Sequence, residues 1–274
     1  MANSAFLGAM SRPLHERLIM AEITRRGLAK VIATGAIGAG VLSTTGGRAL
    51  AAQAEPALAA KAGHAPAAAG HARTAMSANQ ALATLKQGNA NFIADRPVPQ
   101  PIGHKRRLEI ARGQTPFAIL VSCSDSRVAP ELLFGRGLGE LFIVRNAGNT
   151  VDAVAQGSVE YAVAELGVPL IVVLGHERCG AVGAAKAVVE NNARFPGTIG
   201  RVVEPIIPAV LDVRGKPGDP FENAVRQNVR RIVAHLRAEI DQPVLATALR
   251  GSRLRVVGAY YDLDTGTVDF FDEA

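Results

Sequence analysis

Two short apolar runs end abruptly in polar side chains, and this pattern restricts the fold more than any other in the chain. Residues 117–121 (FAILV) are followed by Ser-Cys-Ser-Asp-Ser-Arg, and residues 170–174 (LIVVL) by Gly-His-Glu-Arg-Cys-Gly. Short apolar runs bounded by polar residues are typical of buried strands. Because α/β proteins build their sites where the strands of a sheet end, we expect both runs to be strands whose carboxyl ends contribute to one site.

The remaining patterns alternate between strand and helix. Further strands are expected at residues 141–144, 254–261 and 268–271, and a D-L-D-T-G turn joins the last two as a hairpin. Helical spacing of apolar residues predicts helices near residues 78–94, 152–166, 180–190, 202–211 and 221–239. Ser77 suits the N-cap of the first helix, which either stops at Gly88-Asn89 or continues to about residue 94. Strands separated by helices predict an α/β fold: a mainly parallel β-sheet flanked by helices, with a C-terminal hairpin strand.

Three side chains that follow the two apolar runs are of the types that bind zinc. Cys123 follows the first run, and His176 and Cys179 follow the second. Zinc takes thiolate and imidazole ligands tetrahedrally, and three protein ligands leave one position for water. The sequence contains only these two cysteines, so a single disulfide is the alternative.

Asp125 is a fourth possible metal ligand, and Arg127 lies two residues further along. A planar guanidinium suits a carboxylate. We therefore expect an ion pair that keeps Asp125 off the metal and leaves it able to accept a hydrogen bond or proton from water there. The alternative is an ordinary ion pair within a loop.

The front of the chain is typical of an export signal. Residues 24–30 (TRRGLAK) resemble a twin-arginine signal, and residues 49–51 (ALA) and 52–54 (AQA) fit the A-x-A cleavage pattern. A basic amphipathic N-terminal helix is the alternative. We expect a periplasmic protein without a stable membrane anchor, divided into a twin-arginine-type signal peptide (1–54), an Ala-rich linker (55–76) and a zinc domain (77–274).

The basic charge of the chain does not indicate a nucleic-acid partner. The formal net charge is +6, of which +4 belongs to residues 1–54, with six Arg or Lys and two Glu. Aromatic residues make up 4% of the chain, and there is no Trp. Because the excess charge lies mostly in the front segment and few rings are present to stack on bases, nucleic-acid binding is disfavoured.

The combination of C-S-D-S-R and H-E-R-C resembles the β-class carbonic anhydrases, and the likeness covers roughly residues 77–274. The resemblance implies that Cys123, His176 and Cys179 bind zinc and that Asp125 and Arg127 form the catalytic dyad. It also implies the reversible hydration of carbon dioxide to bicarbonate and a proton by zinc-bound hydroxide.

The resemblance extends to the plant-type branch of that family, in which the zinc keeps an open position. That branch places a glutamine, a phenylalanine and a tyrosine around the substrate, and these types fall on Gln114, Phe142 and Tyr161. In the family, such walls come partly from a neighbouring subunit, so a homodimer or larger homo-oligomer is implied. Plant-type members often show R-N-x-A-N after the second strand, whereas this chain has R-N-A-G-N, which leaves the backbone near Gly148 open.

Three other functions remain as alternatives at this stage. Related proteins of this fold hydrolyse carbonyl sulfide or carbon disulfide with similar ligands. A non-catalytic scaffold stabilised by zinc is a second alternative, although it would need neither Asp125 nor Arg127. The third alternative is the disulfide protein described above.

Overall fold

The computed structural model describes residues 73–96, 98–238 and 243–272. The expected signal peptide (1–54) and most of the expected linker lie outside these residues. Among the described residues, no helix is both long enough and apolar enough to cross a membrane.

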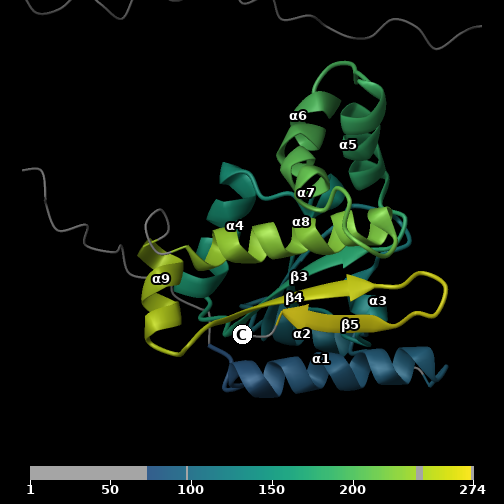
Figure 1. Ribbon diagram of the computed structural model, residues 1–274. Helices are drawn as coiled ribbons and strands as arrows, with labels where there is room; N and C mark the ends of the chain where they lie inside the picture. Colours follow the sequence, from purple (N-terminus) through teal and green to yellow (C-terminus); the bar gives the residue numbers. More distant parts are fainter. Residues whose placement is uncertain (1–72, 97, 239–242, 273–274) are drawn as a thin grey trace, which may run out of the picture. The chain divides into compact units, whose positions relative to one another are not determined.

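The centre of the fold is a five-stranded sheet in the order β2-β1-β3-β4-β5 (Figure 1). Its first four strands are parallel, and β5 runs antiparallel to β4. The strands are β1 (Ala118–Ser122), β2 (Leu141–Arg145), β3 (Leu170–His176), β4 (Arg255–Tyr261) and β5 (Val268–Asp272). The predicted α/β fold, with its mainly parallel sheet and C-terminal hairpin, is confirmed.

Among the described residues, two helices precede β1, and helices lie in each interval from β1 to β4, whereas β4 and β5 are joined by a turn. The helices are α1 (Ala78–Ile93), α2 (His104–Ile110), α3 (Pro130–Leu133), α4 (Ala153–Ala164), α5 (Gly180–Asn191), α6 (Ile199–Val203), α7 (Ile207–Asp212), α8 (Pro220–Arg237) and α9 (Pro243–Arg250), with 3₁₀ turns η1 (Ala147–Asn149) and η2 (Glu204–Ile206). The single helix expected near residues 202–211 is divided into α6, η2 and α7, with Pro205 inside η2 and Pro208 at the start of α7. The apolar pattern of the sequence does not indicate α2, α3 and α9, because helices this short show too few turns of apolar spacing.

Both faces of the sheet are buried, which explains why the central strands are continuously apolar. Ile119 and Val121 of β1 pack on one side with residues of α4, α8 and α9. Ala118 and Leu120 pack on the other side with residues of α1 and with Leu133 of α3. In Figure 1, α8 and α1 accordingly lie on opposite sides of the strands. A charged side chain at any position in β1 would therefore lose its contact with water, which costs free energy.

A third apolar cluster lies at the carboxyl ends of the strands. It contains Cys123 and Cys179 together with residues of α5, α7 and α8. These helices close off the edge of the sheet at which the two sequence motifs emerge, so the motifs lie in a largely buried environment.

Helix α1 continues through Gly88-Asn89 because both residues serve the packing of the domain. Ser77 caps the helix as predicted, in a capping box with Gln80. A Cβ added at Gly88 would lie 2.0 Å from the carbonyl oxygen of Phe134, so only glycine allows α1 to approach this closely. Asn89 donates to the Gly266 carbonyl at 2.9 Å and accepts from the backbone N–H that begins β5, also at 2.9 Å. The two residues that weaken the helix locally thus attach it to the rest of the domain.

Gly88→Ala should lower the free energy of unfolding by about 1–3 kcal/mol, because the added methyl group overlaps a backbone carbonyl. Alanine is the better helix former, so the sign is opposite to that expected from helix propensity. Gly157→Ala in α4 is the matched control: its added Cβ meets nothing within 4 Å, and it should stabilise the protein by about 0.5–1 kcal/mol. Urea unfolding of both variants measures the difference, and equal effects would contradict this account of Gly88.

Candidate metal centre

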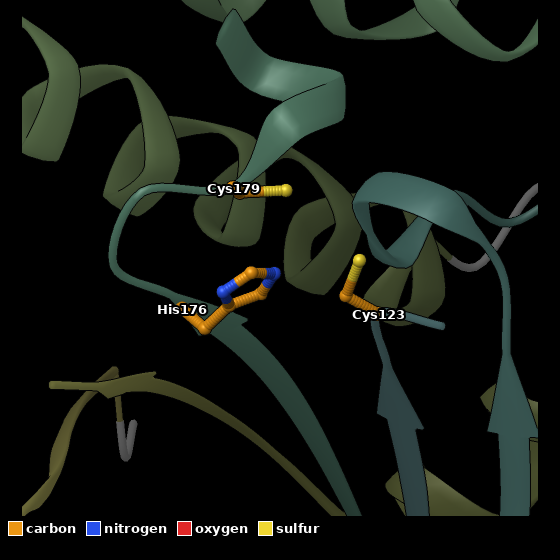
Figure 2. Close-up of side chains that lie close together, drawn as sticks. All are labelled: Cys123, His176 and Cys179. Atoms are coloured by element: carbon orange, nitrogen blue, oxygen red, sulfur yellow. The ribbon is translucent and has the colours of Figure 1, made fainter. Parts of the chain in front are cut away.

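The parallel sheet brings Cys123, His176 and Cys179 together at its carboxyl edge (Figure 2). Cys123 directly follows β1, His176 is the last residue of β3, and Cys179 is the N-cap of α5. The ligand atoms of the three side chains all lie within 4.8 Å of one another, and all three residues are buried. The prediction that the two apolar runs deliver their polar residues to one site is therefore confirmed.

His176 presents an unpaired nitrogen to the two sulfurs. Its side chain is fully buried, and its Nδ1 lies 2.9 Å from the backbone carbonyl oxygen of Glu177. A carbonyl only accepts, so Nδ1 carries the hydrogen and Nε2 keeps its lone pair. Nε2 has no hydrogen-bond partner among the described residues. A buried nitrogen without a partner costs free energy, and a metal ion between the three side chains would remove that cost.

The two thiols are free, which excludes the disulfide alternative for this structure. The hydrogen bond from the Cys179 thiol lowers the pKa of Cys123, with further lowering by the backbone N–H of Gly148, whereas burial raises it. The same hydrogen bond, together with burial, raises the pKa of Cys179. Because cysteine binds zinc as the thiolate, a dication bound at this position would displace the thiol proton. Two sulfurs and one imidazole nitrogen at these separations fit the donor set that zinc prefers.

The structure explains why glycine stands at position 148, where the sequence departs from R-N-x-A-N. Its N–H donates to the Cys123 sulfur at 3.2 Å, and its φ is +68°, a conformation that glycine adopts without strain. A Cβ at this position would lie 2.6 Å from Ile206 Cδ1 and 2.9 Å from Ala181 Cβ. The glycine therefore allows this turn to pack against Ile206 and Ala181 while its N–H reaches the Cys123 sulfur.

Asp125 and Arg127 form the ion pair that the sequence predicted. The guanidinium donates to both carboxylate oxygens, at 2.9 and 2.8 Å, and the backbone N–H of Arg127 adds a third bond at 3.0 Å. These bonds hold the pKa of Asp125 well below its usual range. One carboxylate oxygen lies 3.9 Å from His176 Nε2. The acid is thus ionised, adjacent to the metal position and tied to arginine.

Arg145, which the sequence did not indicate as a site residue, fixes the loop that carries Cys123 and Asp125. Its Nε donates to the carbonyl of Cys123 at 2.8 Å, and its Nη2 donates to the carbonyl of Asp125 at 2.7 Å. Arg145 ends β2, the strand next to β1. Arg145 follows a predicted strand, as Cys123 and His176 do, and this position could have indicated a role at the site. Its two hydrogen-bond acceptors are backbone atoms, however, and a sequence motif does not show such contacts.

The turn after β3 is also held in place by contacts with the turn between β4 and β5. Arg178 has a φ of +51°, which non-glycine residues rarely adopt. Its guanidinium donates to both carboxylate oxygens of Asp264, at 2.6 and 3.0 Å. Glu177 accepts the backbone N–H of Leu263 at 3.1 Å. The turn between β4 and β5 therefore restrains the segment that connects His176 and Cys179.

The three expected substrate residues lie away from this centre in the single chain. Gln114 precedes β1, at the opposite end of the strand from Cys123. Phe142 pairs with Ile119, four residues before Cys123 and therefore about 13 Å away along the strand. Tyr161 lies on α4 with 43% of its surface exposed. One copy of the chain does not bring these side chains to the metal position.

Comparisons of this chain with known proteins, by sequence and by structure, find the same family. A sequence model of the family described as carbonic anhydrase matches residues 118–268. Carbonic anhydrase 2 of Mycobacterium tuberculosis is 41% identical over 182 residues, which span 66% of this chain and 87% of that protein. A tetrameric β-carbonic anhydrase of the ascomycete Sordaria macrospora superimposes with a TM-score of 0.53 and 26% identity, covering 60% of this chain and 84% of that one. The β-carbonic anhydrase CafA of Aspergillus fumigatus superimposes with a TM-score of 0.54 and 27% identity, covering 72% and 91%.

Asp125→Asn should lower stability near neutral pH and have a smaller effect in acid. The folded-state pKa of Asp125 is depressed, so the stability it contributes is present above the unfolded-state pKa of about 3.9 and is lost as pH falls through the folded-state pKa. Urea unfolding of zinc-depleted protein from pH 7 to pH 3 measures the difference between the wild type and the variant. In an Arg127→Gln background, the pH dependence of that difference should shrink. A constant difference across the pH range would contradict the assigned pairing.

Proposed function

This chain belongs to the β-class carbonic anhydrases, and from that premise we propose that it catalyses carbon dioxide hydration at a zinc ion held by Cys123, His176 and Cys179. The family match spans the sheet from the start of β1 to the start of β5. The observation that carries the proposal for zinc is the unpartnered, buried Nε2 of His176 beside two free thiols. Together these atoms provide three ligands of the types that zinc prefers.

A zinc ion bound there would supply a Lewis acid that makes water nucleophilic near neutral pH. The remaining work falls to side chains of this chain. Arg127 holds Asp125 through both carboxylate oxygens, so the carboxylate stays away from the open coordination position. Asp125 remains ionised because its pKa is lowered. It therefore accepts a hydrogen bond from the attacking water and orients it, while the proton released with bicarbonate passes to buffer.

The alternatives receive less support from the same observations. The relatives described above are named carbonic anhydrases, and none of those three is named a carbonyl sulfide or carbon disulfide hydrolase. A purely structural zinc site needs no carboxylate held next to it, whereas Asp125 lies 3.9 Å from His176 Nε2 and is held by three hydrogen bonds. Parallel assays with the three gases distinguish among the enzymatic functions.

We further propose that a second copy of the chain completes the substrate pocket. Gln114, Phe142 and Tyr161 match the substrate residues of the plant-type branch but lie away from the metal position within one copy. Tyr161 is exposed on α4, and Phe142 lies on β2, an edge strand of the sheet. The related Sordaria macrospora enzyme is described as tetrameric. In a homodimer or larger homo-oligomer, these side chains would face the metal centre of a neighbouring copy. Such an assembly explains why they match the substrate residues of the family and yet lie away from the metal position within one copy.

We also propose that the chain is exported to the periplasm, because residues 24–30 resemble a twin-arginine signal. Residues 1–54 lie outside the described part of the structure, so the proposal depends on the sequence alone. Fractionation of cells that express the full chain tests it, and the protein in the cytoplasm at its full length would contradict it.

His176→Ala should reduce bound zinc well below one ion per chain and abolish carbon dioxide hydration, because two sulfurs alone leave two coordination positions to fill. His104→Ala is the matched control, since His104 is an exposed residue at the start of α2. Stopped-flow hydration on zinc-quantified protein provides the measurement. A wild-type protein that contains zinc but does not hydrate carbon dioxide would overturn the proposed activity.

Tyr161→Ala should lower kcat/KM for carbon dioxide by about tenfold, the effect of losing roughly 1.4 kcal/mol of contact energy in the transition state. Its zinc content should remain that of the wild type, because Tyr161 does not lie among the ligands. The same stopped-flow assay, with analytical ultracentrifugation to follow the oligomer, provides the readout. Unchanged kinetics in an intact oligomer would remove Tyr161 from the pocket wall.

A further inference from the structure

A buried asparagine lies behind the metal centre without touching any metal ligand. Asn228 lies on α8 with 3% of its surface exposed. Its side-chain Nδ2 donates to the backbone carbonyl of Gly148 at 3.0 Å. The N–H of the same glycine donates to the Cys123 sulfur at 3.2 Å. Asn228 is thus connected to a metal ligand through the backbone of a single residue.

The backbone of Gly148 needs such a restraint because glycine allows many conformations. Gly148 lies in η1, a single 3₁₀ turn, so few helical hydrogen bonds hold its orientation. Ile206 and Ala181 close the space beside it, and Asn228 holds its carbonyl. Together these contacts aim the N–H at the sulfur.

Packing alone does not explain an asparagine at this position. The neighbouring buried residues of α8 include Val225, Val229 and Ile232, which already attach the helix to the core. Burying an amide costs free energy unless it is hydrogen-bonded, and an apolar side chain would avoid that cost. What the amide adds is the bond to Gly148.

We propose that Asn228 is a positioning residue for the metal ligand Cys123, acting through the backbone of Gly148. The inference depends on the zinc site proposed above. An N–H directed at a thiolate draws negative charge from the sulfur and fixes the direction of its lone pairs. Partners of this kind behind the ligands typically change metal affinity by about 10–100-fold when they are removed.

The test compares Asn228→Leu with Val233→Ala. Leucine has a similar size to asparagine but no donor. Alanine at position 228 is less suitable, because Asn228 lines a pocket of about 400 Å³ from which water could reach the Gly148 carbonyl. Val233 is a fully buried residue of the same helix, so Val233→Ala destabilises the protein without removing a hydrogen bond to Gly148.

Zinc release to a chelator, followed with a colorimetric zinc indicator, should be about 10–100-fold faster in Asn228→Leu than in the wild type. In cobalt-substituted protein, the near-ultraviolet sulfur-to-cobalt charge-transfer band should shift in Asn228→Leu. Val233→Ala should lower the melting temperature while leaving both the release rate and the band unchanged. If Asn228→Leu does not fold, Asn228→Met, which also fills the space but has no donor and adapts to irregular packing, should give the same changes.

The outcomes separate this inference from the proposed function. A wild-type protein that holds no zinc at Cys123, His176 and Cys179 would overturn the proposed zinc site. If the wild type holds zinc there, but the Asn228 variant has the same zinc release rate and cobalt spectrum as the wild type and Val233→Ala, only the role of Asn228 is overturned.

Discussion

The parallel pairing of β1 with β3 is the constraint on which the rest of the site depends. Ser122 pairs with Leu174, so Cys123 leaves the sheet beside the strand end that carries His176. Both strands are buried on both faces, and a one-residue shift in their register would turn apolar side chains away from the core they fill. The free energy that stabilises the sheet therefore also sets the separation of the ligand atoms.

Backbone groups and charged side chains then fix what the strands bring together. Arg145 holds the loop after β1 through two carbonyls, and Gly148 directs an N–H at a sulfur. Arg127 restrains the nearby carboxylate. Because Cys123 and Gly148 are buried, the low local dielectric strengthens the hydrogen bond between them and makes any unpaired polar group beside them costly. The guanidinium of Arg127 is half-exposed, so its ion pair with Asp125 depends on bidentate geometry instead. Such a site is well ordered only when its surroundings are complete.

The metal centre and the substrate pocket differ in what one chain provides. The three candidate ligands meet within a single copy, so the proposed zinc site would form in the folded chain without a partner. Phe142 and Tyr161 lie on an edge strand and on an exposed helix surface, where a neighbouring copy can use them. In the proposed assembly, metal binding depends on folding and substrate binding depends on association, which makes the two steps experimentally separable.

Residue order alone predicted the α/β fold, the five strands, the longer helices, the three candidate ligands and the pairing of Asp125 with Arg127, because each of these leaves a local pattern of apolar spacing or short-range chemistry. Only the tertiary structure showed that α1 continues through Gly88-Asn89, that Gly148 contacts Cys123, and that Asn228 lies behind it. These features join residues as far as 179 positions apart. Contacts of that kind involve backbone atoms and close approaches between elements, and they exist only once the sheet and its helices have packed together.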